Sequence, residues 1–325
     1  MCSRFTPPIF PDAAPNPLGR ADTLIAVEPT TEEAANVRRA LKHLRSELAA
    51  WGPVTTGGHT PARRWVVTLQ DGRTAFVKVA TDDLTASWLR DEHVAYSVLR
   101  GSNFMPTYLG FYDDGAHPVL ALEDLSMVDW PPPWNRPMVD AVLGCLEAMH
   151  ATTPPQGIPR ADDDRFELRD GWDEVAADPE PFLALGLCSR AWLESSLPTL
   201  REAVRTAPLG GEALLHFDVR SDNICVHDGR AFLVDWNWIC VGNPLIDVAF
   251  WLPSLEAEGG PAPEEILPNG TPGLAELAAC FAGFCCEHAG RSPIPTAPGV
   301  RRLQLQLART ALPWAARCLG LPEPS

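Results

Sequence analysis

The spacing of apolar residues in the first third of the chain predicts a helix followed by strands. Between residues 30 and 50 apolar side chains recur at helical spacing, and Thr30 and Glu33 stand in capping-box register. We therefore expect one packing helix over 30–50. Its predicted buried face is formed by Val37, Leu41, Leu44 and Leu48.

Strand-like runs dominate the next segment and predict a small antiparallel sheet of four or five strands. Two pairs of runs surround turns at Asp71-Gly72 and at 113–115, and a helical pattern over 84–100 separates the pairs. The runs are Arg64–Leu69, Thr74–Ala80, Thr107–Tyr112 and His117–Leu122.

The pattern becomes mainly helical after residue 125. Three consecutive prolines exclude a helix from 129–135. Residues 1–29 are rich in Pro and Ala without periodicity, which indicates an irregular arm. We therefore divide the chain into this arm, a β-rich N-lobe (30–125) and a helical C-lobe (126–325). Helices are predicted over 136–150, 189–206, 270–289 and 299–318, with another containing Asp247.

The stretch from His216 to Asp235 combines a predicted hairpin with polar residues at fixed places. Two apolar runs flank Asp228-Gly229, a strong hairpin signal. Antiparallel pairing would bring Asn223, at the start of the first strand, close to Asp235, at the end of the second, with Asp218 in the preceding loop. Such oxygen-bearing side chains suit a hard cation such as Mg²⁺.

This arrangement resembles a known catalytic loop. The spacing H-x-D-x-x-x-x-N, with Asp235 twelve residues after Asn223, is similar to that of kinase-like phosphotransferases. The segments HFDVRSDN and LVDWNWICVGNPLIDVAFW resemble the aminoglycoside phosphotransferase and choline kinase-like family. The resemblance spans most of 50–320, and its specific part is residues 78, 92 and 216–247. It implies an α+β, bilobal protein kinase-like fold with a small antiparallel-sheet N-lobe and a mainly helical C-lobe.

The same resemblance implies roles for individual residues in phosphoryl transfer from ATP or GTP. Asp218 would accept the hydrogen bond and the proton of the substrate hydroxyl, and Asn223 and Asp235 would hold Mg²⁺. Lys78, one of only two lysines against 24 arginines, resembles the strand lysine that pairs with the α/β-phosphates. Glu92 resembles its helix partner, and we prefer it to the adjacent Asp91.

Supporting roles follow from the same likeness. The backbone of Glu123–Leu125, between the lobes, would contact the nucleotide base. Asp247 would brace the catalytic loop, and we interpret His216 as a loop anchor in preference to a base. Arg220 would either steady the γ-phosphate or form a loop-bracing salt bridge.

Other signals leave two interpretations open. The Thr55–His59 loop, with Gly57-Gly58, would cover the phosphates or form an ordinary turn. The acidic segment 162–180 would be a solvated loop or a lid for substrate ammonium groups. Asn237 replaces the Gly of the D-F-G pattern, and only 12 positions separate Asp235 from Asp247. These features favour a small-molecule kinase over a protein kinase.

Charge and composition restrict the partners. The formal net charge is −16, with −3 in residues 1–125 and −13 in 126–325. This excess of acid argues against nucleic acid and would attract a cationic acceptor, although solubility alone explains it equally well. No signal peptide and no apolar run of about 20 residues is apparent, so no membrane partner is expected. Nine cysteines without a C-x-x-C pair favour reduced thiols in the cytoplasm over a metal site at Cys285, Cys286 and His288.

The sequence thus predicts an O-phosphotransferase that transfers the γ-phosphate to a hydroxyl of a small, cationic molecule. An aminoglycoside-like antibiotic is the preferred acceptor. Choline, sugar, homoserine and macrolide kinases are alternatives. A nucleotide-binding pseudokinase scaffold is a weaker one, because every expected polar group is present. The sequence indicates no particular oligomeric state.

Overall fold

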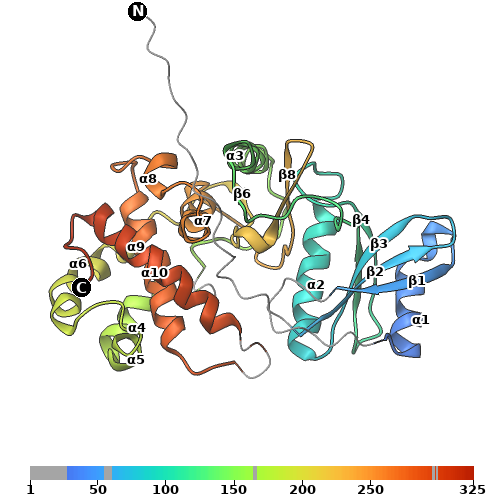
Figure 1. Cartoon of the computed structure of the whole chain (residues 1–325), viewed down its shortest axis with the longest axis horizontal. Coiled ribbons are helices and arrows are strands. Elements are labelled where there is room, and N and C mark those ends of the chain that lie inside the picture. The colour runs from blue at the N-terminus through green and yellow to red at the C-terminus, as the bar shows by residue number, and fades with distance from the viewer. Residues whose placement is uncertain (1–27, 55–60, 164–166, 295–296, 298) are drawn as a thin grey trace, which may run out of the picture.

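The computed structural model describes residues 28–54, 61–163, 167–294, 297 and 299–325, and within them the chain forms two lobes (Figure 1). The predicted arm (1–29), apart from residues 28 and 29, and the Gly57-Gly58 loop lie outside these ranges. The elements of the N-lobe are α1 (Thr31–Ala40), η1 (Lys42–Leu44), β1 (Leu48–Pro53), β2 (Arg63–Leu69), β3 (Thr74–Val79), α2 (Asp83–Val98), β4 (Tyr108–Tyr112) and β5 (Val119–Leu122).

The C-lobe is mainly helical, as predicted. Its helices are α3 (Arg136–His150), α4 (Gly171–Ala177), α5 (Glu180–Leu183), α6 (Arg190–Thr206), η3 (Ser221–Asn223), α7 (Leu245–Ala257), α8 (Pro263–Ile266), α9 (Leu274–Gly290) and α10 (Gly299–Leu319). Its short strands are β6 (Ala213–Leu215), β7 (Ile224–His227), β8 (Arg230–Leu233) and β9 (Cys240–Gly242).

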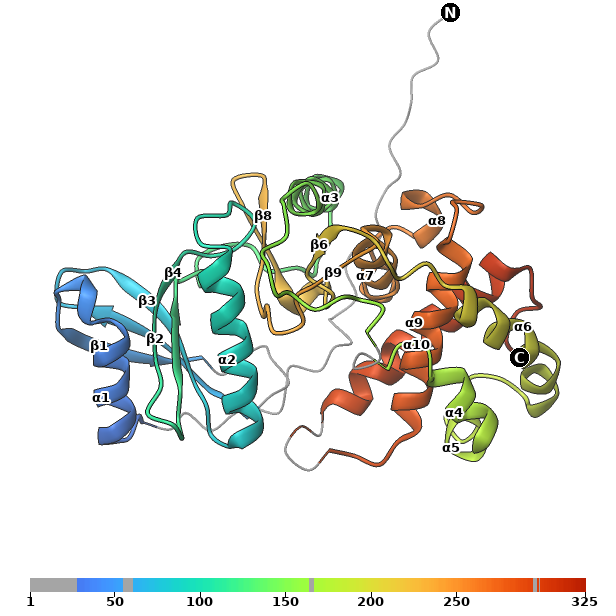
Figure 2. The same cartoon turned by 180° about the vertical axis from the view of Figure 1, so that it is seen from behind.

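The N-lobe sheet is antiparallel throughout, with strand order β1-β2-β3-β5-β4. Its two faces carry different cores because successive side chains on a strand point to opposite faces. On β3, Val77 packs in the cluster of α1, while Phe76 packs in the larger cluster that includes α2. Figures 1 and 2 show α2 on the side of the sheet toward the C-lobe. Lys78 alternates with Val77 and therefore belongs to the α2 face.

The prediction of a single long helix over 30–50 was wrong. The capping box of Thr30 and Glu33 is present, but α1 ends at Ala40, and a residue in the left-handed region (Arg45, φ 53°) follows η1. Leu48 begins β1, which pairs with β2. The helical spacing of apolar residues continued into a segment whose conformation is determined by sheet pairing, which local periodicity does not detect.

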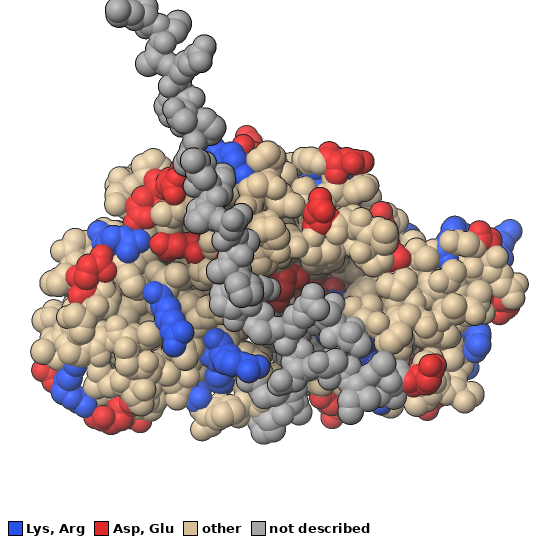
Figure 3. Space-filling model, in the orientation of Figure 1, with Lys and Arg blue, Asp and Glu red and all other residues tan. Residues whose placement is uncertain are grey.

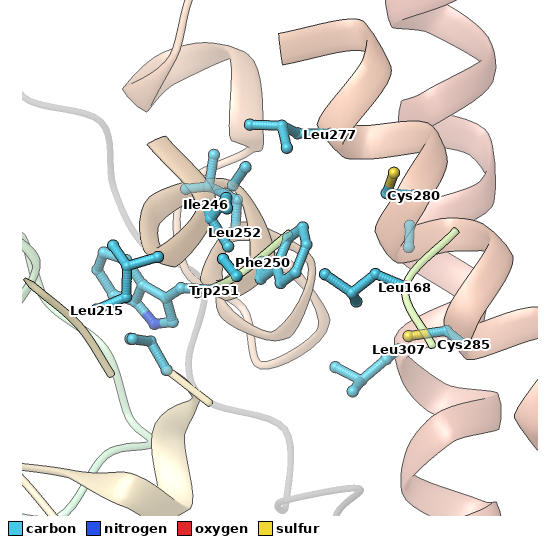
Figure 4. Close-up of a cluster of buried hydrophobic side chains, with 14 of the residues drawn as sticks. Leu168, Leu215, Ile246, Phe250, Trp251, Leu252, Leu277, Cys280, Cys285 and Leu307 are labelled. Atoms are coloured by element: carbon cyan, nitrogen blue, oxygen red, sulfur yellow. The ribbon is translucent and has the colours of Figure 1, made fainter. Parts of the chain in front are cut away.

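Helix α7 occupies the centre of the C-lobe core. Nine of its 13 residues are buried, including Phe250 and Trp251. Figure 4 shows Phe250 directed toward Leu168 and the α9 side, with Leu215 next to Trp251. A helix that is apolar on all sides is fixed by its neighbours, so any polar residue on it is held firmly in place.

Further features concern membrane-spanning helices, thiols and metal ligands. Within the described ranges no helix has both the length and the apolarity needed to cross a bilayer. No disulfide joins any of the eight described cysteines, and Cys285 and Cys286 are fully buried. The described residues contain no cluster of His, Cys, Asp and Glu able to hold a metal ion.

Candidate active site

The amine of Lys78 joins the two lobes. Lys78 Nζ lies 2.9 Å from Glu92 Oε1 and 3.0 Å from Oε2, and it also hydrogen-bonds Asp235 Oδ1 of the C-lobe. Glu92 is only 3% exposed on α2, whereas Asp91 is exposed. The sheet face and the helix therefore bring Glu92, and not its neighbour, to Lys78.

Burial and mutual attraction shift the pKa values of Lys78, Glu92 and Asp235. The pKa of Glu92 is raised to about 7, because the effect of burial exceeds the opposing effect of the Lys78 ammonium. Burial would also raise the pKa of Asp235, but the Lys78 ammonium outweighs it and the pKa is lowered. Burial lowers the pKa of Lys78, but the two carboxylates more than compensate and leave it raised. One ammonium thus stays charged between two carboxylates.

The predicted hairpin places Asn223 next to Asp235. Ile224 pairs with Leu233 across β7 and β8, and Val234 N donates to Asn223 O at 3.0 Å. The next residue, Asp235, has a left-handed backbone (φ 62°) that ends the strand. Asparagine and aspartate side chains at the two open ends of a hairpin become neighbours in this way.

Asn223 also contacts the loop before it. Its Nδ2 donates to Asp218 O at 2.9 Å and to Asp218 Oδ2 at 3.0 Å. Asn223 Oδ1 is buried and has no hydrogen-bond partner among the described residues. A buried amide oxygen without a donor, close to a carboxylate, fits an ion such as Mg²⁺.

Arg220 lies among the acidic side chains of the loop. Its Nη1 is 3.2 Å from Asp218 Oδ1, and its Nε donates to Asp222 Oδ1 at 2.7 Å. Burial raises the pKa of Asp218, and Arg220 lowers it by less. Arg220 thus forms salt bridges within the loop, and its role toward the γ-phosphate stays a prediction.

His216 and Asp247 hold the catalytic loop in place by hydrogen bonds. Asp247 is 1% exposed, and its carboxylate accepts from His216 N (3.0 Å) and Phe217 N (2.7 Å). His216 Nε2 donates to Val234 O at 2.8 Å, while Asp218 N donates to His216 Nδ1 at 3.3 Å. Both ring nitrogens are thus occupied. Burial lowers the pKa of His216, which keeps the ring neutral.

The segment between the lobes is ordered by its own hydrogen bonds. The Glu123 carboxylate accepts from Thr107 N (2.9 Å) and Oγ1 (2.8 Å). Leu125 O accepts from Trp130 Nε1 at 3.0 Å, whereas no described residue accepts from Leu125 N–H. A ligand at this edge would therefore meet a backbone donor at Leu125, and the side chain of Glu123 is already engaged.

Sequence reasoning missed Glu258, which lies just after α7. It accepts hydrogen bonds from Trp134 Nε1 (2.9 Å) and from Ser221 Oγ in the catalytic loop. Burial raises the pKa of Glu258 to about 7, although these hydrogen bonds lower it. No local pattern connects Glu258 with Ser221, because 37 residues separate them.

Sequence reasoning also missed Arg64 on β2, which pairs with Lys78 in the β2–β3 ladder and whose Nε and Nη2 atoms are buried. A signal existed for this residue. Arg64 and Lys78 are each seven residues from Asp71, so the predicted turn already implied their pairing.

The acidic segment 162–180 is partly helical instead of being a continuous loop. It includes α4 and ends at Glu180, the first residue of α5, and residues 164–166 lie outside the described part. Arg201 pairs with Asp173, and Arg190 Nη2 lies 2.5 Å from Glu180 Oε1; the four side chains are at least 50% exposed. These pairs correspond to the solvated interpretation of the segment.

In Figure 3 the surface is hollowed between the lobes, and Asp or Glu atoms are visible inside the hollow. Among the described residues, the contacts given above gather Lys78 and two arginines with the carboxylates of Asp218, Asp222 and Asp235. Such an arrangement can bind a metal–polyphosphate complex and accept a proton from a nearby hydroxyl.

Comparisons with known proteins agree with this geometry. A sequence profile described as the phosphotransferase enzyme family matches residues 54–280. No curated protein matches the chain by sequence. A thermostable mutant of aminoglycoside phosphotransferase APH(4)-Ia, solved with AMP-PNP and hygromycin B, has a TM-score of 0.56 at 17% identity, covering 90% of this chain and 98% of its own.

A second solved structure gives the same result. A protein named as a fructosamine-3-kinase from Thermobifida fusca has a TM-score of 0.52 at 20% identity, covering 87% of this chain and 99% of its own. At these identities the likeness establishes the fold. The predicted bilobal α+β fold, with an antiparallel-sheet N-lobe and a helical C-lobe, is confirmed.

Proposed function

Because this chain belongs to the phosphotransferase enzyme family and is a small-molecule kinase, we propose that it transfers the γ-phosphate of ATP or GTP to a hydroxyl group of an aminoglycoside-like amino alcohol. The observation that carries this proposal is the contact of Lys78 with Asp235 across the cleft, beside the Asn223–Asp218 pair. This cluster unites one amine and three oxygen-bearing side chains from distant parts of the chain.

In the proposed mechanism the nucleotide lies between the lobes. Lys78, held by Glu92, binds phosphate oxygens, and the backbone of Glu123–Leu125 meets the base. Leu125 N–H, which lacks an acceptor among the described residues, supports this placement. Asn223 and Asp235 would hold Mg²⁺, which neutralises phosphate charge when bound. The orphaned Asn223 Oδ1 supports this assignment.

Asp218 orients the acceptor hydroxyl and takes its proton as the phosphoryl group is transferred. Its raised pKa suits a base that must remain a carboxylate yet accept a proton late. The Asp218 carboxylate is held by Arg220 at Oδ1 and by Asn223 at Oδ2. His216 and Asp247 position the loop through the hydrogen bonds described above.

Charge supports a cationic acceptor. Residues 126–325 carry a net charge of −13, and the carboxylates of Asp218, Asp222 and Glu258 lie around the catalytic loop. An ammonium-bearing sugar alcohol would be attracted by this field and could stack on the 40% exposed Trp238. Choline, homoserine, neutral sugars and macrolides have fewer amines or none, and they are the alternative acceptors.

We place this activity in the cytoplasm, where ATP is available and thiols stay reduced. The absence of a disulfide among the eight described cysteines supports that placement. An enzyme acting there on an aminoglycoside would confer antibiotic resistance.

A panel assay tests the proposal. Purified protein is incubated with Mg²⁺, ATP or GTP, and one acceptor at a time: several aminoglycosides, choline, homoserine, neutral sugars and macrolides. Mass spectrometry then detects the phosphorylated product. Phosphorylation of an aminoglycoside supports the proposal, and phosphorylation of another group alone selects an alternative. Nucleotide binding without any product would favour the scaffold interpretation.

A further inference from the structure

Arg64 occupies a position beside Lys78 that the mechanism above leaves unused. The two residues are direct partners in the β2–β3 ladder, and facing residues of neighbouring strands extend from the same face of a sheet. Arg64 therefore lies on the α2 side, toward the cleft. Its neighbour Arg63 has a different partner, Glu33 of α1, at 2.8 Å.

Two of the three guanidinium nitrogens of Arg64 are buried without a hydrogen bond. Nε and Nη2 are inaccessible to solvent and have no hydrogen-bond partner among the described residues, where no carboxylate forms an ion pair with Arg64. Buried charged groups in proteins are ordinarily paired, because losing water without a replacement partner is unfavourable. An unpaired guanidinium in a cleft therefore implies a ligand.

The charged groups near Arg64 indicate the charge of that ligand. Burial lowers the pKa of Arg64, while the carboxylates of Asp235 and Asp222 raise it. Both carboxylates already hydrogen-bond other cations, Lys78 and Arg220. The guanidinium thus lies near the place where the proposed mechanism puts the polyphosphate, with donors still to be satisfied.

We propose that Arg64 is a second phosphate-binding cation that grips the nucleotide polyphosphate alongside Lys78. A guanidinium fork matches two phosphate oxygens, whereas the Lys78 ammonium acts as a point charge. This inference rests on the proposed nucleotide-dependent function and adds a binding residue to it.

Nucleotide titration measures this contribution. Calorimetry with Mg²⁺ compares ATP, ADP and adenosine in the full chain, in Arg64→Met, in Arg64→Lys and in Arg63→Met. Loss of hydrogen bonds to a charged ligand should weaken ATP binding by Arg64→Met about ten- to hundredfold, with adenosine affinity unchanged. Arg64→Lys should recover part of the loss. Arg63→Met, which removes a charge from the other face of the same strand, should bind all three as the wild type does.

The outcomes separate the possibilities. Unchanged ATP affinity in Arg64→Met would overturn the proposal. Equal weakening of ATP and adenosine, with a lower unfolding temperature in the absence of nucleotide, would show a structural role and also overturn it. Should Arg64→Met fail to fold, Arg64→Lys decides, because it keeps the charge and loses only the fork. A wild-type protein that binds neither ATP nor GTP would refute the proposed function itself.

Discussion

Replacing Asp247 by asparagine probes how the buried α7 controls the catalytic loop. Asp247 accepts three hydrogen bonds, from His216 N, Phe217 N and His150 Nε2 at 2.7–3.0 Å. Asparagine keeps one acceptor oxygen and turns the other end into a donor, so at least one buried N–H loses its partner. One unsatisfied buried donor costs about 1–3 kcal/mol, and neutralising the acceptor weakens the remaining bonds. We expect Asp247→Asn to lower the free energy of unfolding by about 2–4 kcal/mol.

Urea denaturation followed by tryptophan fluorescence measures this loss. Turnover should fall about 100-fold as well, because Phe217 (φ 68°) and Asp218 lose the anchor that fixes their geometry. Asp140→Asn is the matched control, since Asp140 is 53% exposed and its one ion pair among the described residues is with Arg136 on the same helix. That change should stay within about 0.5 kcal/mol. An Asp247→Asn protein as stable as this control would refute the reasoning.

Three other substitutions test separate parts of the structure. Asp218→Asn should reduce turnover by orders of magnitude while calorimetry still detects nucleotide binding; near-normal turnover would remove Asp218 from the role of base. Glu258→Gln should change how stability depends on pH. The wild-type carboxylate has a pKa raised to about 7 in the folded protein, so between pH about 4.5 and about 7 it ionises more readily in the unfolded chain. The wild type should therefore lose about 2–3 kcal/mol of stability relative to this variant as pH rises across that range. Parallel urea midpoints across that range would contradict it. Gly110→Ala should lower stability by about 2–3 kcal/mol in thermal unfolding, because its Cβ would overlap the Ala40 carbonyl of α1; an unchanged midpoint would show that α1 can move away.

Local signals predicted the parts of the site that lie within one hairpin. The Asp228-Gly229 turn and its flanking apolar runs define a register that brings Asn223 to Asp235. The Lys78–Glu92 contact could not be predicted from local signals alone, because strand and helix periodicity do not indicate which helix residue meets the sheet. The resemblance to a known family supplied that information, and the short strand–helix connection made it geometrically possible.

Long-range contacts could not be obtained from the sequence. The segment from Leu48 has helical apolar spacing, yet pairing with β2 makes it a strand. Likewise, Glu258 reaches Ser221 only because α7 is buried in the core and directs its end toward the loop. Both depend on tertiary packing, which acts on residues that are distant in the chain.

The double attachment of Lys78 has a consequence for the order of events in the cleft. While Asp235 Oδ1 accepts from the amine, the donor and the acceptor of that hydrogen bond are not available to an incoming ligand. A divalent cation that draws Asp235 away liberates the amine for phosphate, and phosphate that draws the amine away liberates the carboxylate. Each ligand thus makes room for the other, so their affinities should be positively cooperative and reciprocal.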